Sequence, residues 1–207
     1  MYVTQPRDYH GKLIRYRKNI HSQNGEDGII RRLIDLLEID EPGWCCEFGA
    51  WDGKHLSNTY NLIRNYSWNS VLIESDDDKF KSLLKMQSEH DNVIALHETV
   101  HYINGKGENL DDILSSTDIP RDFDILSIDV DGPDYHIWKT LENYRPKIVI
   151  IEHSGLEEYI IQKEGAKHKK DKYGSTSFQP IRELGESKGY KLMADTGNMI
   201  FVDENVL

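Results

Sequence analysis

Four side chains that could do acid–base or metal chemistry follow two apolar runs in the second half of the chain. Asp129 and Asp131 come directly after one run, and Glu152 and His153 end and follow the next. Both runs have the composition of strands that are buried on both faces. Because the carboxyl ends of parallel strands meet at one edge of a sheet, we expect these four side chains to lie close together at that edge.

Two chemistries are open to this group. Asp131, His153 and Asp129 are the candidate catalytic residues, with His153 or Asp131 as a metal-free general base, because an imidazole titrates near neutral pH. Alternatively, Asp131, Glu152 and His153 bind a divalent cation such as Mg²⁺, which would lower the pKa of a bound hydroxyl. Two neighbours have structural interpretations: Asp134 as the N-cap of the next helix, and His136 inside that helix.

A second group of residues predicts a cofactor loop. The stretch Glu47-Phe48-Gly49-Ala50-Trp51-Asp52-Gly53 follows a short apolar segment, and its glycines allow a tight turn and a close approach to a ligand. Glu74 lies 74 − 53 = 21 positions after Gly53, at the end of the next predicted strand. An acid in that place can accept both hydroxyls of a ribose. The Gly-x-Gly-x-x-Gly pattern of nicotinamide-binding folds is absent from this turn.

The elements that must position these groups alternate between strand and helix. Apolar runs predict strands at 44–48, 70–74, 92–96, 123–129 and 147–152. Helical spacing of apolar residues predicts helices at 28–37, 55–65, 78–90, 110–115, 134–141 and 180–188. Two last strands, 190–194 and 198–202, flank the turn Asp195-Thr196-Gly197-Asn198. We therefore expect an α/β, Rossmann-like, doubly wound and mostly parallel sheet with an antiparallel C-terminal hairpin strand.

Composition narrows the class of protein. The 207 residues suffice for one domain, which we expect at 22–207 after an irregular N-terminal arm at 1–21. A formal net charge of −11 disfavours nucleic acid as a partner. Cys45 and Cys46 are adjacent, so neither a mutual disulfide nor a structural zinc site is expected. Met1 to Lys18 lacks an apolar signal core and no segment could span a bilayer, so we expect a cytoplasmic protein.

Taken together, these motifs resemble class I S-adenosylmethionine-dependent methyltransferases. The order that carries the resemblance is Glu47-x-Gly49-x-x-x-Gly53, then Glu74, then Ile128-Asp129-Val130-Asp131-Gly132. Three further stretches look like the FkbM-type methyltransferases: Ser22-Gln23-Asn24-Gly25-Glu26-Asp27, Leu56-Ser57-Asn58-Thr59 and Ser127-Ile128-Asp129-Val130-Asp131-Gly132. The resemblance covers roughly residues 22–155.

This resemblance implies S-adenosylmethionine as the cofactor. Gly49 and the neighbouring backbone would meet its methionine moiety, Glu74 would bind its ribose, and Asp129 would lie beside the methyl group. Glu47 would order the loop or approach the amino-acid end of the cofactor. The adenine would lie near Thr99 and Val100. The full set of expected cofactor-binding residues is Glu47, Gly49, Ala50, Gly53, Glu74, Ser75 and Asp129. The chain departs from the family at Trp51, where a third glycine is frequent.

Three functions stay open. The first is O-methylation of a small polar acceptor, and the resemblance favours a sugar, glycan unit or nucleotide sugar. The second is a metal-dependent glycosyltransferase that uses Asp129-Val130-Asp131 as an Asp-x-Asp motif. The third is a non-catalytic nucleotide-binding module, because a fold alone does not prove activity.

Residues outside these motifs could add to acceptor binding. The basic run from Lys167 to Lys172 is either a solvated loop or a clamp for the phosphates of an activated sugar, supported by the hydroxyls of 174–177. Trp51, Trp138 and Tyr173 could stack on a sugar face, although burial in a core is the commoner fate of such rings.

Overall fold

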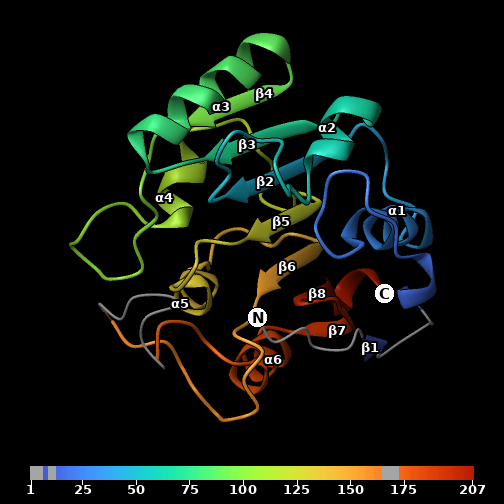
Figure 1. Cartoon of the computed structure of the whole chain (residues 1–207), viewed down its shortest axis with the longest axis vertical. Helices are drawn as coiled ribbons and strands as arrows, with labels where there is room; N and C mark the ends of the chain where they lie inside the picture. The colour runs from blue at the N-terminus through green and yellow to red at the C-terminus, as the bar shows by residue number, and fades with distance from the viewer. Residues whose placement is uncertain (1–6, 9–12, 165–172) are drawn as a thin grey trace.

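One mixed β-sheet organises the chain in a computed structural model that describes residues 7–8, 13–164 and 173–207. The strands are β1 (Arg7–Asp8), β2 (Trp44–Phe48), β3 (Asn69–Ile73), β4 (Val93–Leu96), β5 (Ile125–Ile128), β6 (Ile148–Glu152), β7 (Tyr190–Asp195) and β8 (Asn198–Asp203). Their order across the sheet is β1-β7-β8-β6-β5-β2-β3-β4 (Figure 1). Strands β2 to β6 are parallel, whereas β8 runs antiparallel to both β6 and β7.

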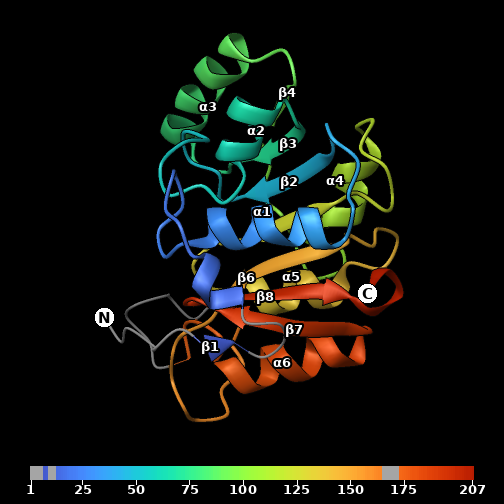
Figure 2. The same cartoon turned by 90° about the vertical axis from the view of Figure 1, so that its right-hand side faces the viewer.

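Helices cover both faces of this sheet. The α-helices are α1 (Glu26–Leu36), α2 (Tyr60–Tyr66), α3 (Asp77–Glu89), α4 (Leu110–Ser115), α5 (Asp134–Thr140) and α6 (Phe178–Ser187). Apolar residues of α1, α2 and α3 pack in one core, and those of α4, α5 and α6 pack in the other. Figure 2 shows α1 lying in front of the sheet and α6 below β7. This arrangement confirms the predicted doubly wound α/β fold with an antiparallel C-terminal hairpin.

Alternation along each strand divides the side chains between the two cores. Cys45 points into the α1 side and Cys46 into the α5 side, and both thiols are free and fully buried. The same alternation applies to polar residues at the strand ends, because successive side chains point to opposite faces. It therefore decides which of those residues can meet.

The sheet has a switch point between β2 and β5. From β2 the chain proceeds to β3 and β4 on one side, and then returns to β5 and β6 on the other. Ligands of open parallel sheets bind outside the carboxyl ends of the strands at such a point. The cofactor loop (residues 49–53) leaves β2 there, and Asp129 directly follows β5.

Two expectations about local structure were wrong. Residues 55–59 are not helical, since α2 begins only at Tyr60, and their hydrogen bonds explain this below. The N-terminal arm is not wholly irregular: β1 pairs with β7, and Leu13, in the 3-10 helix η1 (Leu13–Tyr16), is fully buried. The basic run 167–172 lies outside the described residues. Within the described ranges, no helix combines the length and the apolar character needed to cross a bilayer.

Candidate active site

The cofactor loop and the end of β5 are in direct backbone contact. Phe48 and Ile128 are partners in the parallel pairing of β2 and β5, so Gly49 and Asp129 leave the sheet side by side. Gly49 has a φ of +74°, and a Cβ built on it would overlap the carbonyl oxygen of Asp129. Only glycine combines that backbone with that approach. The loop predicted to bind the cofactor thus touches the first residue of the predicted reaction site.

Trp51 follows the path that glycine usually takes. Its φ is +50°, which is in the left-handed region, so the departure from the family's glycine pattern does not exclude that backbone conformation. Its side chain is 47% exposed, and Lys79 Nζ lies 4.9 Å from the ring centroid. Gly53 ends the loop with a φ of +71°, where a Cβ would overlap Met86 Sδ.

Glu74 joins the two segments of the predicted cofactor site. It is buried; its Oε2 accepts a hydrogen bond from the backbone N–H of Trp51 at 2.8 Å, and its Oε1 accepts one from the N–H of Asp76 at 2.8 Å. Each carboxylate oxygen can accept a second hydrogen bond. Glu74 can therefore shape the loop and still accept from ribose hydroxyls, and this ribose role stays a prediction.

A cavity of about 470 Å³ opens beside Glu74 at the ends of β3 and β4. That volume is in the usual range for small-molecule sites. Ser75 and Thr99, which were expected at the cofactor, both line it, whereas Val100 packs against the core on the α4 side. The lining residues are Ser75, Asp77, His97, Glu98, Thr99, His101, Gly107 and Glu108.

Glu47 organises the segment that sequence periodicity had predicted as helix. This buried carboxylate accepts hydrogen bonds from Ser57 Oγ at 2.5 Å, Thr59 Oγ1 at 2.6 Å and the N–H of Asn58 at 3.1 Å, and Ser127 Oγ lies 3.4 Å away. Burial raises the pKa of Glu47, while these donors act to lower it. Polar residues that bond elsewhere compete with a helix, so residues 57–59 form a polar turn instead.

Three carboxylates gather at the ends of β5 and β6. Asp129, Asp131 and Glu152, here called the carboxylate cluster, each offer an oxygen within 4.8 Å of the others. Asp129 is exposed as a residue, yet loss of hydration around its carboxyl group, followed by the charges of Glu152, Asp134 and Asp131, raises its pKa to about 8. Asp131 has a φ of +57°, a strained backbone of the kind that is frequent at functional sites.

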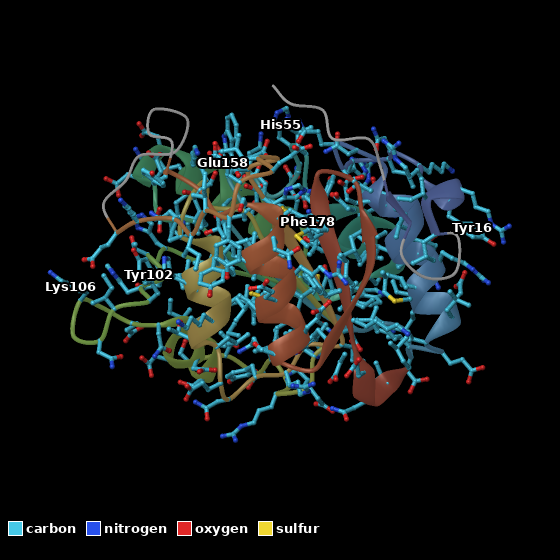
Figure 3. The ribbon with its side chains drawn as sticks, turned by 90° about the horizontal axis from the view of Figure 1, so that it is seen from below. Tyr16, His55, Tyr102, Lys106, Glu158 and Phe178 are labelled. Atoms are coloured by element: carbon cyan, nitrogen blue, oxygen red, sulfur yellow. The ribbon has the colours of Figure 1, made fainter. Side chains whose placement is uncertain are left out.

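His153 does not join the cluster. It follows Glu152 on the strand and therefore points to the opposite face. There it is buried, with Nε2 3.1 Å from Asp195 Oδ1, and its Nδ1 accepts the N–H of Gly155 at 3.2 Å. Its ring also contacts Phe178, which Figure 3 labels near the middle of the molecule. The structure thus places this predicted base and metal ligand in a buried pair, a result that strand alternation alone could have indicated.

Asp134 holds the turn that carries Asp131. It is the first residue of α5 rather than its N-cap, which is Pro133, so the predicted position was wrong by one residue. Its buried carboxylate accepts the N–H groups of Val130 and Gly132, both at 2.9 Å. The role of Asp134 is structural, as expected, and it shapes the loop next to the cluster.

Two of the aromatic side chains near this site, His136 and Trp138, have packing roles. His136 belongs to α5 and stacks on Tyr102, which Figure 3 labels, at 4.8 Å, and its Nε2 lies 2.8 Å from the carbonyl oxygen of Gln162. Trp138 is fully buried against Phe201 at 5.0 Å, so it cannot stack on an acceptor. Tyr173 is 39% exposed, with Lys163 Nζ 4.2 Å from its ring centroid.

The stretch 22–27 ties α1 to the turn between β7 and β8. Glu26 is buried and accepts hydrogen bonds from Thr196 Oγ1 at 2.6 Å and Asn198 Nδ2 at 3.3 Å. Asn198 pairs with Glu152 in the antiparallel ladder. Residues 22–27 therefore lie near the carboxylate cluster, a position that sequence reasoning did not assign to them.

Comparison with known proteins assigns the chain to a family. A model of the methyltransferase FkbM domain matches residues 49–192, more than half of the chain. That span includes the cofactor loop, Glu74 and the whole carboxylate cluster. A search of curated proteins gives no significant match.

Solved structures share the fold at low sequence identity. The N-terminal domain of EvdMO1 with SAH bound has a TM-score of 0.55 at 9% identity, over 88% of this chain and 82% of that one. The citrinin polyketide synthase CMeT domain has a TM-score of 0.51 at 11% identity, over 89% and 55%. The chain spans less than two thirds of the length of the latter.

Proposed function

The chain belongs to the FkbM family of class I S-adenosylmethionine-dependent methyltransferases, and from this premise we propose that it methylates a hydroxyl group of a small polar acceptor, such as a sugar or glycan unit. One observation carries the proposal: the cofactor loop meets the backbone of Asp129, a member of the carboxylate cluster, at Gly49. A hydroxyl that attacks a sulfonium methyl group must lose its proton. The cluster offers an acceptor for that proton beside the loop.

Asp129 is the proposed general base. A base is most effective when its pKa lies near the working pH, and the pKa of Asp129 is raised to about 8. In the reaction, the acceptor oxygen bonds to the methyl carbon as the sulfur–methyl bond breaks, and the hydroxyl proton passes to Asp129. S-adenosylhomocysteine and the methyl ether are the products. Asp131 and Glu152 orient the acceptor, since carboxylate oxygens accept hydrogen bonds from hydroxyl groups.

The cofactor is proposed to lie across the ends of four strands. Glu74 accepts from the ribose, and the cavity lined by Ser75 and Thr99 receives the adenine. The backbone of 49–53 faces the methionine arm. Within this loop, the N–H of Ala50 donates to the carbonyl of Ile73 at 3.1 Å and the N–H of Gly53 to that of Ala50 at 2.7 Å, so internal bonds fix its path.

A divalent cation is the second candidate for the cluster. Three carboxylates within 4.8 Å of one another form an oxygen donor set that suits a hard ion such as Mg²⁺. Asp129, Asp131 and Glu152 would hold it, without His153. Such an ion would polarise the acceptor hydroxyl and lower its pKa.

A direct assay tests the proposal. Purified protein is incubated with S-adenosylmethionine and a panel of monosaccharides, methyl glycosides and UDP-sugars, and products are analysed by mass spectrometry. We expect methyl ethers of one acceptor class, and loss of product with Asp129→Asn. Calorimetry with S-adenosylhomocysteine and UDP-sugars tests the Asp-x-Asp glycosyltransferase alternative. Binding of the UDP-sugars alone would overturn our proposal. Binding of S-adenosylhomocysteine with no transfer to any acceptor would favour the non-catalytic module.

A further inference from the structure

Asn58 carries a buried acceptor atom that the described residues leave unused. Its side chain is 5% exposed, its backbone N–H donates to Glu47 Oε1 at 3.1 Å, and its Nδ2 donates to Ser127 Oγ at 3.1 Å. Among the described residues, Asn58 Oδ1 has no hydrogen-bond partner. A buried polar atom without a partner is costly and calls for a ligand or water.

The position of Asn58 places this oxygen at the switch point of the sheet. Glu47 belongs to β2 and Ser127 to β5, and both side chains point to the face covered by α1, as Cys45 and Ile125 do. Asn58 bridges these two strands from the turn that precedes α2. It therefore stands next to the point where the cofactor loop leaves β2.

The surroundings of Asn58 favour a cationic donor over an anionic group. Glu47 belongs to the same hydrogen-bond network. Asp129 follows Ser127 by two residues, so its side chain leaves the end of β5 on the same face of the sheet, the one that α1 covers. A ligand ammonium group beside this amide oxygen favours the ionised forms of the two acids and is attracted by them, whereas a ligand carboxylate is repelled by those forms.

Strand order indicates which part of the cofactor reaches this point. The adenine cavity lies at β3 and β4, and Glu74 follows β3. A cofactor anchored there and passing over Gly49 at β2 directs its other arm toward β5. From β4 to β5 the sheet spans three strand spacings, about 14 Å. The arm that arrives beside Asn58 is the amino-acid arm, which carries an ammonium group.

We propose that Asn58 Oδ1 accepts a hydrogen bond from the ammonium group of the cofactor's methionine arm. The inference rests on the proposed orientation of the cofactor and adds a cofactor-binding residue to it. Asn58 then selects ligands that carry the complete amino-acid arm over truncated nucleosides. Its Nδ2, held by Ser127, keeps the oxygen in the required orientation.

Three ligands and one isosteric substitution test this role. Asn58→Leu keeps the shape of the side chain and removes the acceptor. Its affinities for S-adenosylhomocysteine, for the deaminated analogue of that compound and for 5′-methylthioadenosine are measured by calorimetry. We expect about tenfold to hundredfold weaker binding of S-adenosylhomocysteine, as for loss of a hydrogen bond to a charged group. Binding of the two ligands without an ammonium group should be unchanged.

Matched variants separate recognition from folding. Asn61→Leu alters another buried asparagine, whose Oδ1 accepts from Asn65 Nδ2 at 2.8 Å outside this network, and should not change the preference for S-adenosylhomocysteine. Asn58→Asp keeps an acceptor oxygen and should retain that preference even if Asn58→Leu does not fold. Equal affinity of Asn58→Leu and parent for S-adenosylhomocysteine, or equal weakening of all three ligands, would overturn the inference. A parent protein that binds none of them would overturn the proposed function itself.

Discussion

Glu74 Oε2 accepts a hydrogen bond from the backbone N–H of Trp51 at 2.8 Å, so the acid after β3 fixes the loop after β2. The same carboxylate accepts the N–H of Asp76 and thereby also fixes the turn that begins α3. Sequence reasoning treated Glu74 as a ribose ligand and Trp51 as a departure from the glycine pattern. The structure makes them partners, because the left-handed backbone of Trp51 presents its N–H to Glu74.

Glu74→Ala should weaken both cofactor binding and the loop. We expect S-adenosylhomocysteine to bind at least about tenfold less tightly, because hydrogen bonds to a charged acceptor are lost. The free energy of unfolding should also fall, since two backbone N–H groups lose their acceptor. Calorimetry and urea unfolding measure the two effects. Asp78→Asn, at an exposed residue of α3, is the control. Unchanged binding in Glu74→Ala would remove the ribose assignment.

Gly49→Ala should be more harmful than an alanine at another left-handed glycine. Gly105 has a φ of +78° with no atom near its missing Cβ, so Gly105→Ala reports backbone strain alone, about 1 kcal/mol. Gly49→Ala adds overlap with the carbonyl of Asp129, and we expect a loss of about 3 kcal/mol in the free energy of unfolding. Urea unfolding compares the two variants. Equal losses would show that the contact with Asp129 is easily relieved.

The raised pKa of Asp129 predicts a dependence of stability on pH. Between about pH 4 and about pH 8 the folded protein retains a proton on Asp129 that the unfolded chain has released. The contribution of this group therefore lowers the free energy of unfolding as pH rises through that window. Asp129→Asn should remove that part of the slope, whereas Asp122→Asn, at an exposed residue outside the cluster, should not. Denaturant titrations at several pH values measure the slopes.

The same group predicts the pH profile of methyl transfer. The ionised form of Asp129 is the proposed base, so the rate should rise with pH and level off above about 8. Asp129→Asn should lower the rate by about a hundredfold or more, the usual contribution of a general base. A profile that keeps its shape in Asp129→Asn would assign the titration to another group.

His153→Ala should affect stability rather than chemistry. The buried carboxylate of Asp195 would keep its hydrogen bond from the N–H of Gly197 but would lose its contact with His153. Removal of the imidazole ring would also leave a cavity. We expect a loss of about 2–4 kcal/mol in the free energy of unfolding. Turnover per folded molecule should stay near that of the parent. A selective loss of turnover without loss of stability would restore His153 to the reaction site.

A chelator distinguishes the two forms of the carboxylate cluster. If Asp129 acts as a metal-free base, dialysis against a strong chelator should leave the rate of methyl transfer unchanged. Loss of the rate, restored by added Mg²⁺, would instead assign Asp129, Asp131 and Glu152 to a cation. Glu152→Gln is the companion variant, because it removes one charge of the cluster and leaves the base in place.

Local patterns in the sequence determined the elements and their order. The apolar runs predicted β2 to β6 within about two residues at each end, and helical spacing predicted α1, α3, α4 and α5 with similar accuracy. Strand–helix alternation then implied a parallel sheet, whose strand ends bring Gly49 and Asp129 to one edge. These features follow from the spacing of apolar residues within each strand or helix, which can be read from a short stretch of sequence.

Contacts between distant segments decided the rest. Residues 57–59 turn around Glu47 because their hydrogen bonds go to another strand, and Glu26 meets Thr196 across 170 positions of sequence. His153 lies outside the predicted site because side chains alternate along β6, and its ring therefore points toward Asp195 on the other face of the sheet. Such polar groups bond to whatever the fold brings near them. The sequence alone therefore determined the family and the edge of the sheet where the proposed site lies, and only the tertiary structure decided which acids, amides and imidazoles meet there.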